Sequence, residues 1–239
     1  MASHRVGRIV LPLLVVLLAA ACTRVVDGTV RPARGLSPRP LNGQTVRQVL
    51  LDDTELFKLI GQRFKSKAEL PPRFGGRELL FGLDASPSEC AGVVFALDKS
   101  SYGTADVSTV AQESWWTVGV RGAKVISVSE SVVALPTAVA AGALFAKFTQ
   151  EWNRCNGATV TAHFPSGGGP SATISDVRAA DSVLAATVES SYTITSARAV
   201  GARVNCLVEV DVAFFIDHHP DGTAADVAHR MMDKVSGLS

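Results

Sequence analysis

The most compact group of possible metal ligands in this sequence lies at residues 217–221, where two adjacent histidines stand between two aspartates. His163 and His229 lie elsewhere in the chain. A zinc site needs about four ligands that converge on one ion, and two adjacent histidines cannot easily both point at it. We therefore interpret the group as a solvated loop before the last helix, and we expect no metal and no cofactor.

Catalytic signatures with a local sequence pattern do not occur in the chain. It has no G-x-S-x-G, no H-E-x-x-H, no S-x-x-K and no phosphate-binding glycine loop before a helix. The sequence therefore indicates a protein that is not an enzyme. The alternative is a cell-envelope hydrolase whose serine, His163 and aspartate come together only in the folded chain.

The tryptophan pair Trp115-Trp116 is the more informative group for binding. Neighbouring residues of a strand face opposite sides, so we expect one indole in the core and the other facing solvent or a groove. Tyr102, Glu113 and Arg121 are near in sequence, and we predict that these five residues line a ligand surface. Plain packing of the indole against a helix is the more conservative interpretation.

Cys22 ends an apolar run that begins at residue 11, and Arg5 and Arg8 precede the run. A basic start, a short apolar segment and small residues before a cleavage point form a secretory signal, and the run is too short to span a bilayer comfortably. Because it ends on cysteine, it resembles a bacterial lipoprotein signal. We predict that residues 1–21 are removed and that Cys22 carries a palmitate-bearing anchor on the extracytoplasmic face of the cell membrane. A buried N-terminal helix is the alternative.

Residues 22–40 are rich in proline, glycine and arginine and have no sustained apolar period, so we expect a flexible tether. The folded domain then spans residues 41–239. The chain has 23 basic and 22 acidic residues, and removal of the signal takes away two arginines and no acid. The mature chain is nearly neutral, which argues against nucleic acid as a partner.

Helices are predicted at four places. Residues 52–61 have apolar groups on one helical face and a glycine stop, and residues 136–154 have an apolar stripe at helical spacing. Residues 223–237 are predicted as the last helix. Ser86-Pro-Ser-Glu89 has the pattern of a capping box, which predicts a helix from this point. Helical spacing then turns four residues toward the core: Cys90, Val93, Val94 and Leu97.

Strands are predicted from stretches of alternating apolar and polar residues. In residues 202–216 the alternation predicts a strand with one buried face that carries Cys206. The mixture of half-buried strands and helices predicts an α+β domain, with helices packed on a twisted, mainly antiparallel sheet. Further predicted strands lie at residues 106–118, 124–135, 158–164, 183–190 and 191–197.

Two cysteines, Cys90 and Cys155, face inward on predicted helices of a chain that we expect to be exported. Exported domains fold in an oxidising compartment, so we expect these two to form a disulfide that staples the fold. Cys206 is then left as a buried and inert thiol. Pairings of Cys206 with Cys90 or Cys155 stay open from sequence alone.

Several of these segments together resemble the PknH-like extracellular sensor domain, a family that includes mycobacterial lipoproteins. The resemblance rests on Ser-Glu-Cys90-Ala-Gly-Val, Ser101-Tyr102-Gly103, Trp152-x-x-Cys155, Ala197-Arg198-Ala199 and Asn205-x-x-Val-x-Val-Asp211-Val. It implies an α+β fold with a ligand-sensing groove, and it implies the disulfide that matches Cys90 to Cys155. Many relatives carry a second pair of cysteines near the positions of Ser196 and Phe214. This chain has no cysteine at either position.

The function that these observations favour is that of a membrane-anchored extracytoplasmic lipoprotein with a sensor-like domain. We expect it to bind a small molecule, a lipid or an envelope component, or to present a surface to an envelope protein partner, without catalysis. The cell-envelope hydrolase is the alternative, and loss of turnover on a His163→Ala change would support it.

Overall fold

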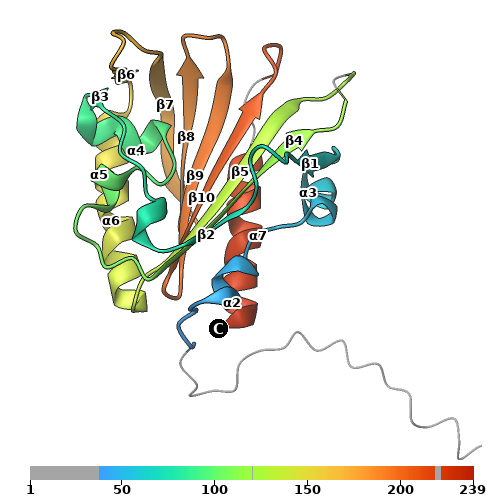
Figure 1. Ribbon diagram of the computed structural model, residues 1–239, viewed down its shortest axis with the longest axis vertical. Coiled ribbons are helices and arrows are strands. Elements are labelled where there is room, and N and C mark those ends of the chain that lie inside the picture. Colours follow the sequence, from blue (N-terminus) through green and yellow to red (C-terminus); the bar gives the residue numbers. More distant parts are fainter. Residues whose placement is uncertain (1–37, 120, 219–221) are drawn as a thin grey trace, which may run out of the picture. The chain divides into compact units, whose positions relative to one another are not determined.

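The computed structural model describes residues 38–119, 121–218 and 222–239, which form one antiparallel sheet with helices on both faces (Figure 1). The predicted signal peptide, Cys22 and most of the tether lie outside these residues, as do His219 and Asp221. Leu41 is the first buried residue of the described chain. The Asn205 side chain holds its backbone through bonds of 2.7 and 2.9 Å, to the N–H and the carbonyl oxygen respectively.

The sheet is ten-stranded, and neighbouring strands follow the order β1, β4, β5, β10, β9, β8, β7, β6 and β3, while β2 also pairs with β4. All these pairs are antiparallel. The strands are β1 Phe64–Ser66, β2 Arg73–Gly75, β3 Ala85–Ser86, β4 Thr109–Thr117, β5 Val125–Ala134, β6 Thr159–Ala162, β7 Ser171–Ala180, β8 Val183–Ser190, β9 Thr195–Arg203 and β10 Cys206–Phe214.

The helices divide between the two faces of the sheet, so the α+β prediction is confirmed. Helices α2, α3 and α7 pack on one face, and α4, α5 and α6 pack on the other (Figure 1). The described helices are α2 Gln44–Arg47, α3 Asp53–Ile60, α4 Ala91–Val94, α5 Lys99–Tyr102, α6 Ala138–Cys155 and α7 Thr223–Leu238, with short 3-10 turns η1 Arg77–Leu79 and η2 Ser88–Cys90.

Two apolar cores result, one on each face, and β10 belongs to both. Its Val208 lies in the core with Met231 of α7, whereas its Leu207 lies in the core with Phe148 of α6. The prediction of one buried face for this strand was therefore wrong. Glu209, one of the polar residues that alternate with the valines, is itself buried and hydrogen-bonded.

Helix α3 begins and ends where the sequence predicts. The Asp52 carboxylate accepts from the Glu55 backbone N–H at 2.8 Å, and the Glu55 side chain accepts in return from the Asp52 N–H. This reciprocal pair satisfies two amides that the first turn leaves without helical partners. Gly61 then ends the helix in the left-handed conformation, with φ of 72°, which glycine adopts without steric cost.

The capping box predicted at residues 86–89 does not form. Ser86 ends strand β3, and Pro87 precedes the 3-10 turn η2 without any side-chain cap. The Ser86 hydroxyl instead contacts His163. Ser86 therefore fits the sequence pattern of a helix cap, but its hydrogen-bond partner is a side chain far along the chain. Cys90, Val93 and Leu97 are nevertheless buried as predicted.

Strands β7 and β9 differ most from the prediction. Half of β7 is exposed, and a register shift between Ser175 and Arg178 interrupts its alternation of buried and exposed residues. Residues 191–194 form a turn in place of the predicted strand, and β9 runs on to Arg203. The buried Arg198 in the middle of β9 interrupts the apolar pattern, which explains why the pattern failed there.

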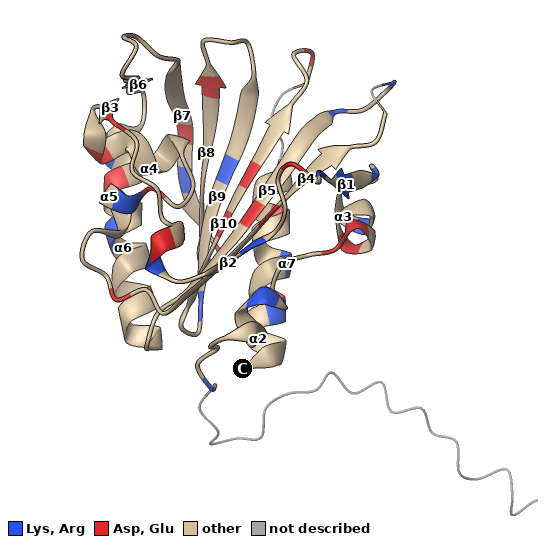
Figure 2. Ribbon diagram, in the orientation of Figure 1, with Lys and Arg blue, Asp and Glu red and all other residues tan. Residues whose placement is uncertain are grey.

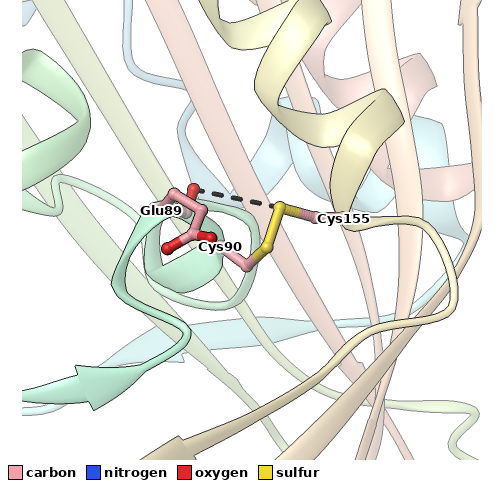
Figure 3. The surroundings of a disulfide bond; sticks show 3 residues. All are labelled: Glu89, Cys90 and Cys155. Atoms are coloured by element: carbon pink, nitrogen blue, oxygen red, sulfur yellow. Dashed lines mark hydrogen bonds between the residues drawn. A yellow bond between two sulfur atoms is a disulfide. The ribbon is translucent and has the colours of Figure 1, made fainter.

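The disulfide joins Cys90 to Cys155 at the end of α6, as expected (Figure 3). The carbonyl oxygen of Glu89 lies 3.9 Å from the Cys155 Sγ atom. Cys206 is free and fully buried, and burial raises the pKa of its thiol to about 12. A thiol that stays protonated is a poor nucleophile, in agreement with the prediction of an inert core residue.

Candidate functional site

The two tryptophans lie in β4 and are both half-buried. Trp115 packs against the core that contains α7. The ring of Trp116 is covered by Lys67, whose Nζ lies 3.7 Å from the ring centroid. Arg121 is exposed in the turn after β4. A ligand-binding role for these residues stays a prediction.

Tyr102 lies apart from the tryptophans, because it is buried between α5 and α6. Its hydroxyl donates to the Glu209 carboxylate, and its ring meets Phe148 edge-on at 5.4 Å. Burial raises the pKa of the phenol, and the negative charge of Glu209 raises it further. The structure therefore gives Tyr102 a partner inside the core, and its predicted ligand role stays untested.

Glu113 of β4 lies next to another acidic residue rather than next to Tyr102. It stands directly opposite Glu130 of β5, and the Glu130 carboxylate accepts from the Leu51 N–H at 2.8 Å. Burial raises the pKa of Glu130 to about 8 and also raises that of Glu113. Glu130 is thus a carboxyl group beneath the segment that joins α2 to α3.

A buried ionic network lies on the opposite face of the sheet. Arg198 of β9 is fully buried, and its NH2 atom lies 3.2 Å from the Glu209 carboxylate of β10. Its other donors bind the carbonyl oxygens of Val93 at 3.1 Å, Val210 at 3.2 Å and Gly92 at 3.5 Å. Each guanidinium nitrogen therefore has a partner. Figure 2 shows charged residues of both signs on these central strands.

Asp211 extends this network to the surface. It pairs with Arg198 across the β9–β10 ladder, and its Oδ2 atom lies 4.0 Å from the Arg198 Nε atom. Its side chain is 28% exposed. Burial raises the pKa of this carboxyl group, and the positive charge of Arg198 opposes that shift.

The Asp211 side chain lines a pocket of about 140 Å³. Apolar residues from α4, from the strands β7 and β8 and from the turn before β9 surround it, and three serines from β7, β8 and β9 complete the lining. The lining residues are Val94, Phe95, Pro170, Ser171, Ala172, Val188, Ser190, Ile194, Ser196 and Asp211.

A row of polar residues continues from Asp211 across the sheet. Asp211 pairs with Ser129 of β5, and the hydroxyl of Ser129 lies 3.0 Å from that of Ser114 in β4. Ser114 lines a second recess of about 470 Å³, together with Gln112, Glu113 and the segment that precedes β2. The two recesses are thus joined by a polar row on the sheet, which is a geometry suited to binding.

The hydrolase alternative has one supporting contact. The Ser86 hydroxyl oxygen lies 2.9 Å from His163 Nε2, and both side chains are exposed. His163 also donates its backbone N–H to the carbonyl oxygen of Asp84. No carboxylate is seen to orient the imidazole within the part of the chain that the structure describes, so two of the three groups of a triad are in place.

Residues 38–119, 121–218 and 222–239 contain neither a cluster of metal ligands nor a membrane-spanning helix. No group of three or more potential ligands is placed to hold a metal ion there. No helix in these ranges is both long and apolar enough to cross a bilayer. Two members of the histidine–aspartate group, His219 and Asp221, lie outside the described residues.

Sequence reasoning gave no functional role to Arg198, Glu209, Asp211 or Glu130. A signal was present for Glu130, Glu209 and Asp211, because each is a charged residue inside a stretch with strand-like alternation. Arg198 lies just beyond the stretch predicted as a strand. A charge in that setting is buried with a partner or marks a site. The partner lies on another strand, and so it could not be named from local spacing.

Comparison with known proteins agrees with the fold. The profile of the PknH-like extracellular domain family matches residues 41–234. The crystal structure of the extracellular domain of PknH from Mycobacterium tuberculosis superposes with a TM-score of 0.71 at 19% identity, over 84% of this chain and 100% of that chain. At that identity the likeness shows the fold alone.

A structure of an uncharacterized protein from Mycobacterium smegmatis gives a TM-score of 0.39 at 12% identity, over 81% of this chain and 96% of that chain. A search of curated proteins finds no match.

Proposed function

We propose that this chain, which belongs to the PknH-like extracellular domain family, is a membrane-anchored extracytoplasmic lipoprotein whose sensor-type domain binds a ligand without catalysis. The ligand is a small molecule, a lipid or an envelope component, and an envelope protein is a further possible partner. The anchor is the lipid on Cys22, and residues 22–40 tether the domain to it. These parts of the proposal come from the sequence, since they lie outside the described residues.

The observation that carries the binding proposal is the half-exposed Asp211 carboxyl at the pocket between α4 and the strands β8 to β10. Ligand sites are concave and largely apolar, with a few convergent polar groups and perturbed pKa values. The pocket at Asp211 has each of these properties.

Native mass spectrometry of the full chain, extracted in mild detergent from the membranes of an expressing bacterium, tests ligand binding. We expect a bound adduct that leaves on denaturation. A clean mass of the lipidated chain alone, in material extracted from several growth media, would count against a small-molecule ligand and favour a protein partner.

The lipid anchor is tested by a Cys22→Ala variant and by treatment of cells with globomycin. We expect an unprocessed precursor in both cases, whereas a Thr23→Ala variant should be processed normally. A Cys22→Ala chain that still acquires lipid and fractionates with membranes as the wild type does would contradict the proposal.

The hydrolase remains a second candidate because of the contact between Ser86 and His163. An activated serine reacts with fluorophosphonate probes. Labelling of Ser86 that is lost in a His163→Ala variant would support catalysis. We expect no labelling above that of a Ser86→Ala control. A Ser88→Ala variant, which keeps both Ser86 and His163, should label as the wild type does.

A further inference from the structure

We propose that the pocket at Asp211 recognises a small organic ammonium ion. This inference rests on the proposed function and adds the chemical class of the ligand. It follows from three properties of the site: its charge, the burial of its arginine and its apolar walls.

The charge at the pocket is negative. Arg198 forms its 3.2 Å ion pair with Glu209 and lies farther from Asp211, at 4.0 Å. One positive group therefore faces two carboxylates, and Glu209 is only 2% exposed whereas the Asp211 side chain is 28% exposed. The charge that a ligand meets is that of Asp211. A cation that contacts it would complete a chain in which charges alternate in sign.

Arg198 is not available to bind an anion. Its Nε atom donates to Val93, its NH1 atom to Val210, and its NH2 atom to Gly92 and Glu209. Its side chain is fully buried. A carboxylate or phosphate in the pocket would approach the Asp211 carboxylate without gaining a hydrogen bond from this guanidinium, so anions are disfavoured.

The walls suit the carbon skeleton of an amine. Val94, Phe95, Val188 and Ile194 supply apolar surface, and Ile194 is 42% exposed although it is a large aliphatic residue. An aromatic ring near a cation adds a favourable electrostatic contact, and Phe95 provides such a ring. The hydroxyl groups of Ser190 and Ser196 on the rim can accept the remaining ammonium protons.

The size of the pocket limits the ligand. Sites for drug-sized molecules enclose about 300–1,000 Å³, whereas this pocket has a volume of about 140 Å³. It accommodates an amine head group with a short aliphatic chain. A longer ligand would extend along the row of Ser129 and Ser114 toward the second recess.

The inference is tested by amide NMR of the folded chain, with isobutylammonium chloride as the cation and isobutanol as its neutral analogue of similar shape. We expect saturable shifts of β9 and β10 amides with the amine and at least tenfold weaker binding of the alcohol. An Asp211→Asn variant should lose at least tenfold in affinity for the amine. The control Asp233→Asn changes an exposed aspartate of α7, on the other face of the sheet, and should bind as the wild type does.

A second measurement does not depend on any variant. Because the ionised form of Asp211 binds the cation, acidification through the pKa of this carboxyl should weaken binding of the amine by the wild type and leave binding of isobutanol unchanged. Equal binding of the two probes, or no binding of either, would overturn the inference. A co-purifying ligand that is neutral or anionic and is retained by Asp211→Asn would overturn it as well, while supporting the proposed function.

Discussion

Glu113 of β4 and Glu130 of β5 stand directly opposite each other on the face of the sheet that packs against α2 and α7. Glu130 is fully buried, and the N–H of Leu51 is its hydrogen-bond donor. Two carboxyl groups in such positions cannot both ionise without repulsion. Burial, and to a lesser degree the charge of Glu113, therefore favour a proton on Glu130, while the hydrogen bond from Leu51 favours the ionised carboxylate.

Stability should depend on this proton. The pKa of Glu130 is about 8 in the folded chain against an ordinary value of 4.5, so between these values the folded state holds a proton that the unfolded state releases. The free energy of unfolding should fall as pH rises through this window, by at most about 1.4 kcal/mol per pH unit from this group. Urea unfolding at several pH values should show a flatter profile for Glu130→Gln. The exposed control Glu189→Gln should keep the wild-type profile, and an unchanged slope in Glu130→Gln would contradict the assignment.

Removal of the disulfide should lower stability strongly. Cys90 and Cys155 are separated by 65 residues, and closing a loop of that length constrains the unfolded chain by about 4 kcal/mol on the chain-entropy estimate. A Cys90→Ala/Cys155→Ala double variant should lose about this much in denaturant unfolding. Its stability should not respond to reductant, whereas the wild type should fall to the same level when reduced. A double variant as stable as the oxidised wild type would refute the expectation.

Removing one partner of the buried Arg198–Glu209 pair should lower the free energy of unfolding strongly. Glu209→Gln removes the nearer counter-charge of the buried guanidinium and leaves it only Asp211, at 4.0 Å. We expect a loss of about 3–5 kcal/mol. Arg198→Met combined with Glu209→Gln should cost less than the sum of the two single changes, since the pair is then removed together. The half-exposed pair Lys147–Glu151 is the control, because Glu151→Gln should cost under about 1 kcal/mol. Additive single and double changes would mean that the two residues do not interact.

Asn205 should hold the backbone in a fixed conformation where the tether meets the domain. Its side chain bonds both backbone groups of Leu41 and donates to the carbonyl oxygen of Leu135 at 2.6 Å. In Asn205→Ala these buried groups lose their partner, and each such loss costs about 1–3 kcal/mol. We expect faster hydrogen exchange at the Leu41 amide. Asn153→Ala, on the exposed side of α6, should leave that exchange rate unchanged.

Much of the fold could be predicted because local spacing reports burial. The α3 boundaries, α6 with its inward Cys155, the strand pair at residues 109–134 and the inward Cys90 all follow from periodicity and caps. The fold class and the disulfide follow from the same patterns. The family resemblance adds to these, and the match over residues 41–234 agrees with it.

Prediction failed where a polar residue has its partner far away in sequence. Ser86 has the type and spacing of a helix cap, but its hydroxyl meets His163, which is 77 residues away. Arg198 interrupts the apolar pattern of β9 because its charge is balanced on β10 and its N–H groups bind the chain at residues 92–93. Local pattern carries no information about such contacts.

The sequence by itself determined the inward cysteines and the class of fold, and it predicts the secretory signal and the tether, because each depends on neighbouring residues or on one helical or strand period. Only the tertiary structure decided which charged residues are buried and which one reaches a pocket. Arg198, Glu209 and Asp211 lie within 14 residues of one another in sequence. Their different exposures arise because the segment with α4 covers Glu209 and leaves Asp211 open at the pocket beside it. That difference depends on long-range packing, which determines how far each charged side chain is exposed to water.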